Sequence, residues 1–281
     1  MPQKVLARLL EIISAAQPGY APRVVLDVGA RDCRESLDLA ARFPSATVYA
    51  FECNPATLPA CRAAAAHEPR LTLTEKAVSD SDGRTAFFPI DQRRTVTGSA
   101  DGNPGASSLF EASGDYPLEQ YVQGRVEVET VRLDTFLGQR GIGHVDVLWM
   151  DVQGAELLVL RGLGARIGDV DWVHLEAEQF EIYRKQALFP EIDGFLAGQG
   201  FDLCGFTSYS MYAVDAVYCN RRLGVSRRRL WSTFRYLRRN WLKLHKHRLK
   251  RWFRRHLGLP EWPQDAARGA RAARPWHRFL P

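Results

Sequence analysis

The sequence predicts an α/β fold in which a mostly parallel, doubly wound sheet of seven strands has helices on both faces. Three observations support this prediction. Short runs of β-branched and other apolar residues recur along residues 22–220, and several of them stop at an acid. Segments with helical spacing alternate with these runs. The first two runs, 24–28 and 48–51, are separated by the length of one βαβ unit.

The N-terminal part of the chain predicts a helix followed by this βαβ unit. Residues 1–21 contain Leu and Ile at amphipathic spacing, interrupted by charged residues, so we expect an amphipathic helix rather than a secretory signal. The first strand ends at Asp27 and turns through Gly29, and the second ends at Glu52.

The remaining elements follow in order. Residues 71–78 alternate weakly and predict a third strand that ends at the turn 79–83. Residues 91–124 are rich in Gly, Ser, Asp and Pro, which is typical of a long functional loop such as a lid or a substrate-binding insertion. Further strands are predicted at 126–131, 145–150 and 171–175, helices at 154–161 and 189–197, and an antiparallel pair of edge strands at 201–206 and 213–218.

Acids at the strand ends indicate what the sheet binds. Ligands of such sheets lie beyond the carboxyl ends of the strands. We therefore expect four acids to converge on one cleft: Asp27, Glu52, Asp151 and Glu176. An acid at the end of the second strand is suited to accept hydrogen bonds from ribose hydroxyls.

The loop after the first strand discriminates among nucleotide cofactors. It has a single glycine where a dinucleotide site needs G-x-G-x-x-G, and the chain contains no P-loop. An acid-rich loop fits a cationic sulfonium and an amino group better than phosphates. The cofactor predicted in this way is S-adenosylmethionine.

At this point the chain resembles a known family. The segments 27–30, 50–55, 77–80, 131–134, 150–156 and 174–176, taken in order, are similar to those of the FkbM-type S-adenosylmethionine-dependent methyltransferases. The resemblance covers about residues 22–220 and implies a Rossmann-like class I methyltransferase fold. It also implies O-methyl transfer to a hydroxyl of a glycan, sugar or related metabolite. The chain departs from the family at Cys33, where glycine is frequent, and at Cys53, where proline is frequent.

The residues expected to bind the cofactor come from three strand ends and the central strand: Asp27, Gly29, Ala30, Arg31, Glu52, Cys53, Ala77, Val78 and Asp151. Asp27 and Gly29 would face the methionine half of the cofactor, and Glu52 would hold the ribose. Ala77 and Val78 would line the adenine slot, although core residues at those positions would give the same pattern.

Four residues are candidates for catalysis. Asp151 is the first candidate for a general base, because it ends the central strand beside the cofactor. Glu156 could act in the same way or could stabilise the N-terminus of a helix. His174 and Glu176 lie on one face of a strand and could form a base with its orienting carboxylate, although a histidine there is often a hydrogen-bonded core residue. Asp151 and Glu176 could also bind a divalent metal such as magnesium.

The acceptor is expected to meet the loop 91–124. Ser107 and Ser108 could supply hydroxyls to it, while a solvated loop is the alternative interpretation.

Charge divides the chain. Residues 221–281 contain 19 Lys and Arg and two acids, whereas the rest of the chain is acidic. Residues 221–259 predict a basic helical extension in which apolar residues of 226–257 form one stripe, and residues 260–281 predict a disordered tail. Aromatic residues opposite dense Arg and Lys are typical of a helix on an anionic membrane surface. Nucleic acid, the acidic body and a second copy of the chain in a homo-oligomer are alternative partners.

Five scattered cysteines without C-x-x-C spacing favour a reducing cytoplasm and argue against structural zinc. The absence of a long apolar run argues against a membrane-spanning helix. The sequence thus predicts a cytoplasmic O-methyltransferase, peripheral on the inner face of the membrane, with a lipid-linked acceptor. A nucleic-acid methyltransferase anchored by its basic tail and a non-catalytic membrane-associated scaffold are the alternatives.

Overall fold

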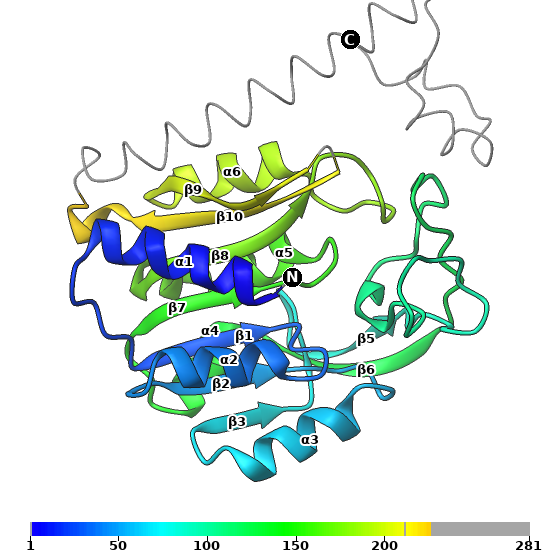
Figure 1. Cartoon of the computed structure of the whole chain (residues 1–281), viewed down its shortest axis with the longest axis horizontal. Coiled ribbons are helices and arrows are strands. Elements are labelled where there is room, and N and C mark those ends of the chain that lie inside the picture. The colour runs from blue at the N-terminus through cyan, green and yellow to red at the C-terminus, as the bar shows by residue number, and fades with distance from the viewer. Residues whose placement is uncertain (1, 211, 226–281) are drawn as a thin grey trace, which may run out of the picture. The chain divides into compact units, whose positions relative to one another are not determined.

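The computed structural model of the chain describes residues 2–210 and 212–225 (Figure 1). The predicted basic stripe over 226–257 and the tail over 260–281 lie outside the described residues. Of the predicted extension 221–259, the structure describes a short 3-10 helix at Arg221–Leu223 and two residues after it.

A seven-stranded sheet forms the centre of the described chain, in the order β3-β2-β1-β7-β8-β10-β9. Its strands are β1 (Val24–Val28), β2 (Thr47–Phe51), β3 (Leu71–Thr74), β7 (Val145–Met150), β8 (Val170–Glu178), β9 (Phe201–Tyr209) and β10 (Ala213–Asn220). The strands from β3 to β8 pair in parallel, and β10 is antiparallel to both β8 and β9. The predicted sheet with its antiparallel edge pair is thereby confirmed.

Helices cover both faces of this sheet (Figure 1). One apolar core joins the sheet to α1 (Pro2–Ala16), α2 (Arg34–Arg42) and α3 (Leu58–His67). The other joins it to α4 (Leu133–Gln139), α5 (Glu156–Gly162) and α6 (Phe189–Gly198). Because both faces are buried, β1 and β7 consist almost entirely of apolar residues, as parallel strands between two helical layers do. None of the described helices is long and apolar enough to cross a bilayer.

A second, three-stranded sheet lies beside the first and was not predicted. It contains β4 (Ala77–Val78), β6 (Val126–Val131) and β5 (Gly83–Phe87), in the order β4-β6-β5. The prediction of one strand over 71–78 is therefore wrong. Phe51, the last residue of β2, pairs with Thr74, so residues after Thr74 have no partner in the main sheet. Ala77 and Val78 pair instead with β6 in the small sheet.

The predicted long loop lies between β5 and β6. It contains a short 3-10 helix at Pro104–Ala106 and several hydrogen-bonded turns. Isolated bridges hold the rest in place, among them Phe88 with Ser108 and Ala112 with Tyr183. This loop and the small sheet stand beside the carboxyl ends of the main strands (Figure 1), which is where a parallel sheet binds its ligands.

Candidate functional site

The ends of three strands meet at Gly29. Its φ is +84°, and a Cβ atom there would lie 2.0 Å from the backbone oxygen of Asp151. The amides of Gly29 and Ala30 both donate to the carbonyl of Phe51 at 3.0 Å. Glycine is needed because only a residue without Cβ permits this close approach. The turn after β1 is thus joined to the ends of β2 and β7.

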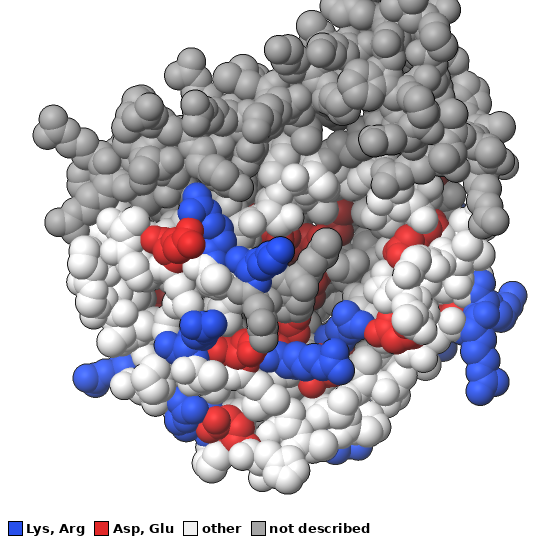
Figure 2. Space-filling model, in the orientation of Figure 1, with Lys and Arg blue, Asp and Glu red and all other residues white. Residues whose placement is uncertain are grey.

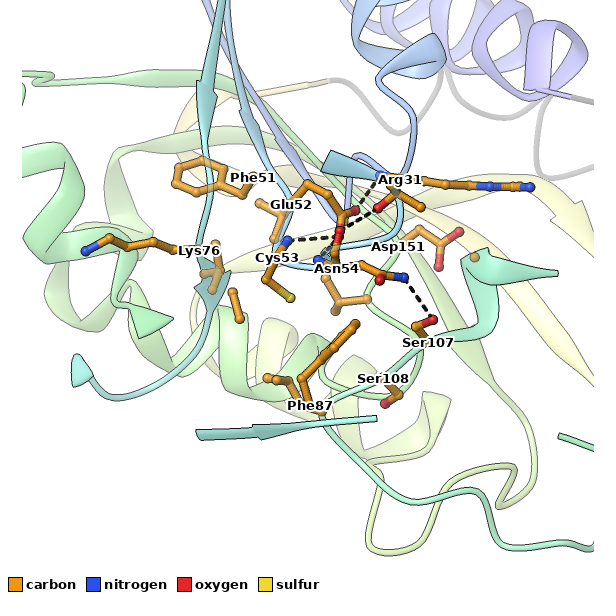
Figure 3. Close-up of a pocket in the computed structure, with 18 of the residues that line it drawn as sticks. Arg31, Phe51, Glu52, Cys53, Asn54, Lys76, Phe87, Ser107, Ser108 and Asp151 are labelled. Carbon is orange, nitrogen blue, oxygen red and sulfur yellow. Dashed lines mark hydrogen bonds between the residues drawn. The ribbon is translucent and has the colours of Figure 1, made fainter. Parts of the chain in front are cut away.

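The carboxylate of Glu52, which follows β2, accepts several backbone hydrogen bonds (Figure 3). It accepts hydrogen bonds from the amides of Arg31 at 2.7 Å, Cys53 at 2.8 Å and Asn54 at 2.6 Å. Burial raises the pKa of Glu52, and these backbone donors oppose the rise. A carboxylate offers about four lone-pair sites, so Glu52 can still accept hydrogen bonds from a ligand.

An open pocket of about 540 Å³, part of it open to solvent, lies in front of Glu52. Phe51 and Phe87 approach it from two sides, and Lys76 extends away from Asp151 (Figure 3). The pocket therefore combines an apolar slot with carboxylates. Its lining residues also include Val28, Thr57, Pro104, Gly105, Leu109 and Val152.

Most of the residues predicted to bind the cofactor line this pocket: Gly29, Arg31, Glu52, Cys53, Ala77, Val78 and Asp151. Asp27 and Ala30 do not line it. The Asp27 carboxylate is buried below the turn and accepts a hydrogen bond from the hydroxyl of Ser36. Burial raises the pKa of Asp27 to about 7. Ala30 is buried among the apolar residues next to α2.

Asp151 and Glu176 form a pair of acids at the ends of β7 and β8. The amide nitrogen of Gln153 donates to Asp151 Oδ1 at 2.6 Å and to Glu176 Oε2 at 3.2 Å. The charge of Asp151, followed by burial, raises the pKa of Glu176 well above its ordinary value. Burial also raises the pKa of Asp151. Because the surface of Asp151 is open to the pocket, solvent screens its charge, and we take Glu176 as the more strongly shifted member.

The other two catalytic candidates lie beneath the pocket. His174 stacks on Trp149 with ring centroids 3.9 Å apart, and its Nε2 lies 2.8 Å from the hydroxyl of Thr207. Burial lowers the pKa of His174 to about 3, which keeps its ring neutral. Glu156 is fully buried, and its Oε1 accepts hydrogen bonds from the amides of Val152 and Gly154 at 3.2 Å each. Glu156 thus holds the loop that follows Asp151.

Ser107 and Ser108 line the pocket, but their hydroxyls are engaged within the protein. Ser107 Oγ donates to the carbonyl of Pro104 at 2.7 Å and accepts from Asn54 Nδ2 at 3.1 Å. Ser108 Oγ donates to the carbonyl of Gln153 at 2.7 Å. Both serines therefore tie the long loop to the strand ends.

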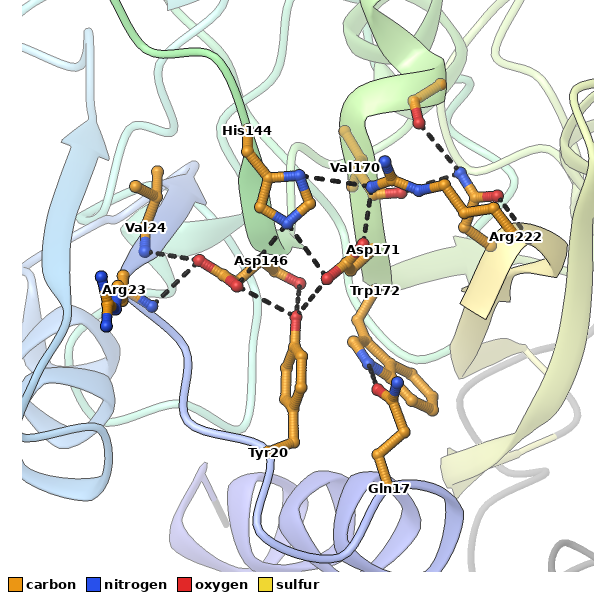
Figure 4. A network of polar contacts seen from close by, with 12 residues as sticks. Gln17, Tyr20, Arg23, Val24, His144, Asp146, Val170, Asp171, Trp172 and Arg222 are labelled. Carbon is orange, nitrogen blue, oxygen red and sulfur yellow. Dashed lines mark hydrogen bonds and ion pairs between the residues drawn. The ribbon is translucent and has the colours of Figure 1, made fainter. Parts of the chain in front are cut away.

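A different set of side chains has the geometry of a metal-binding group. Within residues 2–210 and 212–225, His144, Asp146 and Asp171 are the group of three potential ligands whose atoms lie within 4.8 Å of one another. They lie at the amino ends of β7 and β8 (Figure 4), whereas Asp151 in the pocket lining follows the carboxyl end of β7. Their carboxylates are already bonded to Tyr20, to Arg222 and to the amides of Arg23 and Val24. Within the described residues, Asp151 and Glu176 belong to no such group of three, so the structure does not support a metal there.

Sequence reasoning missed an aromatic cluster near Glu176. Tyr116 lies in the long loop, and its ring centroid is 5.8 Å from those of Tyr121 and Tyr212 and 5.9 Å from that of Phe180. These four rings are half-buried. The charges of Glu119 and Glu176 contribute to raising the pKa of Tyr116 to about 12, after burial as the largest cause. The signal that could have predicted this cluster is the presence of Tyr116 and Tyr121 in a loop that is otherwise rich in Gly and Ser.

Two kinds of comparison bear on this site. A model described as the methyltransferase FkbM domain matches residues 27–203. The 2-O-methyltransferase NoeI of Sinorhizobium fredii is 29% identical over 185 residues, which cover 65% of this chain and 72% of that protein. The 31-O-demethyl-FK506 methyltransferase FkbM of Streptomyces tacrolimicus is 30% identical over 193 residues, which cover 63% of this chain and 72% of that protein.

A solved structure of magnesium protoporphyrin IX methyltransferase from Synechocystis PCC 6803, with S-adenosylhomocysteine bound, aligns with a TM-score of 0.42 at 13% identity. The alignment covers 78% of this chain and 83% of that chain.

Proposed function

The chain belongs to the FkbM methyltransferase family, and we propose that it transfers the methyl group of S-adenosylmethionine to a hydroxyl of a sugar, glycan or related metabolite. The observation that carries this proposal is the pocket between Glu52 and Asp151, which joins an apolar slot to two acids at the ends of β2 and β7, the two strands that flank β1. The names of two relatives specify methyl transfer to oxygen, and that chemistry is the one we propose for this chain.

The residues present fit the cofactor. Glu52 would accept the ribose hydroxyls, since its carboxylate already points into the pocket and retains acceptor capacity. Apolar side chains beside it would hold the adenine: Phe51, Ala77, Val78 and Phe87. Asp151 would face the charged methionine half. The cofactor supplies a methyl group on a cationic sulfur, which is a good leaving group.

The protein then has to align the acceptor oxygen and remove its proton. Alignment of the reacting atoms accounts for much of the rate in such a transfer. Asp151 lines the pocket and is held by Gln153, so we assign it the role of general base. Asp151 would hold the proton taken from the acceptor hydroxyl, and the amide group of Gln153, which donates to both carboxyls, would keep Glu176 beside it.

The surroundings of Glu176 support an uncharged, ring-shaped acceptor. The half-buried rings of Tyr116, Tyr121, Phe180 and Tyr212 offer apolar faces against which a sugar ring can stack. Figure 2 shows acidic side chains within the central hollow of the face drawn, with Lys and Arg side chains around its edge. Acids at such a rim repel phosphorylated or carboxylated acceptors and accept hydrogen bonds from hydroxyls.

Methyl transfer can be measured with S-adenosylmethionine labelled in its methyl group. We expect label in at least one neutral member of a panel of methyl pyranosides, disaccharides and polyketide alcohols, and none in the corresponding sugar phosphates. Calorimetry with S-adenosylhomocysteine, with and without magnesium, supplies the control for cofactor binding. Binding without methylation of any hydroxyl, together with methylation of an amine or a nucleic acid, would contradict the proposal.

The composition of 226–257 supports a second, finer proposal, namely that the chain works at an anionic membrane on a lipid-linked acceptor. The full chain should sediment with phosphatidylglycerol vesicles and not with phosphatidylcholine vesicles. A chain truncated after Asn220 should lose this binding and keep its affinity for S-adenosylhomocysteine. If the truncated chain still sediments with anionic vesicles, the basic segment is not the anchor.

A further inference from the structure

Gln153 has an unusual backbone conformation directly after the acid that lines the pocket. Its φ is +52°, in the left-handed region that a non-glycine residue rarely adopts. Two side chains hold this turn. Ser108 Oγ donates to the carbonyl of Gln153 at 2.7 Å, and Glu156 Oε1 accepts from the amides on either side, those of Val152 and Gly154. Such a conformation persists only where its surroundings impose it.

The side chain of Gln153 is fixed from both ends. Its nitrogen contacts Asp151 and Glu176, so each carboxyl can receive one of the two N–H groups. Its oxygen lies 2.8 Å from the hydroxyl of Tyr183, which also lies 2.8 Å from the carbonyl of Ala106. The single proton of that hydroxyl can be donated to either acceptor.

Tyr183 is itself held rigidly. It is fully buried, and its amide donates to Gln186 Oε1, which also accepts from the amide of Ile182 at 2.7 Å. Gln186 Nε2 in turn donates to Glu178 at 2.8 Å. A continuous set of hydrogen bonds therefore runs from the end of β8, through Tyr183 and Gln153, to the pair of acids.

The same contacts reach the long loop. Ala106 and Ser108 flank Ser107, and both serines line the cofactor pocket. A shift of this loop moves both the Ser108 hydroxyl that holds the Gln153 backbone and the Ala106 carbonyl that contacts the Tyr183 hydroxyl, the partner of the Gln153 amide oxygen. The position of the acids thus depends on the position of a pocket wall.

We propose that Gln153 is a positioning residue of the methyl-transfer site. Gln153 holds Asp151 and Glu176 together as a pair that shares one proton, and it couples this pair to the loop 104–109. The inference rests on the proposed O-methyl transfer. Two adjacent carboxyls repel when both are charged, and a donor shared between them allows one to stay charged beside its protonated neighbour. The charged oxygen that faces the pocket can then take the proton of an acceptor hydroxyl.

The pair can be observed without an acceptor, by carbon NMR titration of the side-chain carboxyls in the full chain. The variants Asp151→Asn and Glu176→Gln identify the two signals. In the unmodified chain, we expect the pair to lose its second proton at a higher pH than an ordinary acid. In Gln153→Met this step should move upward by about one pH unit or more, because the amide donor stabilises the charged form.

Two further variants sharpen the test. Tyr183→Phe keeps the ring and removes the hydroxyl that orients the amide, so it should shift the titration in the same direction by a smaller amount. Gln17→Met is the matched control, since it removes a glutamine hydrogen bond to Trp172 on the same strand, outside the carboxyl pair. It should leave the titration of the pair unchanged.

Affinity for S-adenosylhomocysteine reports whether each variant is folded and should stay within about twofold of that of the unmodified chain. If Gln153→Met does not fold, Gln153→Asn replaces it: it tolerates the left-handed backbone but is too short to reach both acids, so the same upward shift is expected. An unmoved titration in a variant that binds S-adenosylhomocysteine overturns the role of Gln153. An unmodified chain that fails to bind S-adenosylhomocysteine would instead overturn the proposed function.

Discussion

Strands β7 and β8 carry a pair of acids at each end, and the two pairs have opposite surroundings. At the amino ends, Asp146 and Asp171 have every carboxylate oxygen within 3.2 Å of at least one partner, supplied by Tyr20, Arg222 and backbone amides. At the carboxyl ends, Asp151 and Glu176 share one amide group, and the surface of Asp151 opens to a pocket.

The difference separates stability from function. Fully paired carboxylates at the amino ends tie the segment before β1 and the residue Arg222 after β10 to the central strands (Figure 4). Under-paired carboxyls at the carboxyl ends keep charge available for a ligand, at a cost in stability of the free protein. Substitutions at the two ends should therefore act on different measurements.

The largest effect is expected for Asp151→Asn. Removal of the proposed base should lower methyl transfer by about 10²–10⁴-fold, which is the usual range for general base catalysis. Affinity for S-adenosylhomocysteine should fall far less than turnover, because other residues line the same pocket, and the melting temperature should change little. The measurement is turnover of labelled S-adenosylmethionine beside calorimetry. Full turnover in this variant would remove Asp151 from the mechanism.

Next in size is Asp171→Ala at the opposite end. It removes the buried carboxylate that accepts hydrogen bonds from Arg222 and from the Tyr20 hydroxyl. Because Arg222 is partly exposed and Tyr20 keeps its contact with Asp146, the free energy of unfolding should fall by about 2 kcal/mol. Urea denaturation measures this loss, and turnover per folded molecule should stay unchanged. A loss of turnover without a loss of stability would show that the amino-end cluster is not purely structural.

Glu52→Gln should weaken binding of S-adenosylhomocysteine by about 30-fold, the equivalent of losing hydrogen bonds to a charged group. Calorimetry gives the dissociation constant, with Glu75→Gln as a control, since Glu75 is an exposed acid that pairs with Arg62 away from the pocket lining. Equal affinity in the two variants would contradict a role for Glu52 in holding the ribose.

The smallest effect concerns pH. Burial raises the pKa of Asp215, which lies opposite Glu176 on β10, to about 7 from an ordinary value near 3.8. Its stabilising contribution is therefore fully present below about pH 4 and is lost as the pH rises through 7. Partial exposure reduces the size of this loss to about 1 kcal/mol. The free energy of unfolding should fall between about pH 4 and 7, and less steeply in Asp215→Asn.

Much of the main sheet could be predicted because its signals are local. Apolar runs, acids at their ends and intervening helical spacing located β1, β2, β7 and β8 to within a few residues. The elements missed include β5, which pairs with the distant β6, and α4, a short helix of seven residues. Both acquire their structure from neighbours far along the chain, so their own sequences carry a weak signal.

The candidate site was predictable in its acids and not in their surroundings. Glu52 and Asp151 follow strands whose ends must meet, so their proximity follows from the topology. The burial of Asp27 beneath its turn, the stacking of His174 on Trp149 and the bridging by Gln153 depend on side chains that no local pattern specifies.

The sequence by itself thus determined the class of fold, the rim that carries the acids and the class of cofactor, because strand length, strand punctuation and the absence of a diphosphate loop are read from neighbouring residues. Only the tertiary structure decided which acids line the pocket and which are buried or paired. It brought Ser108 to Gln153 across 45 residues and Tyr183 to Ala106 across 77. Contacts at such separations arise from packing of the whole chain, so they fix the chemistry of each carboxyl only once the fold has formed.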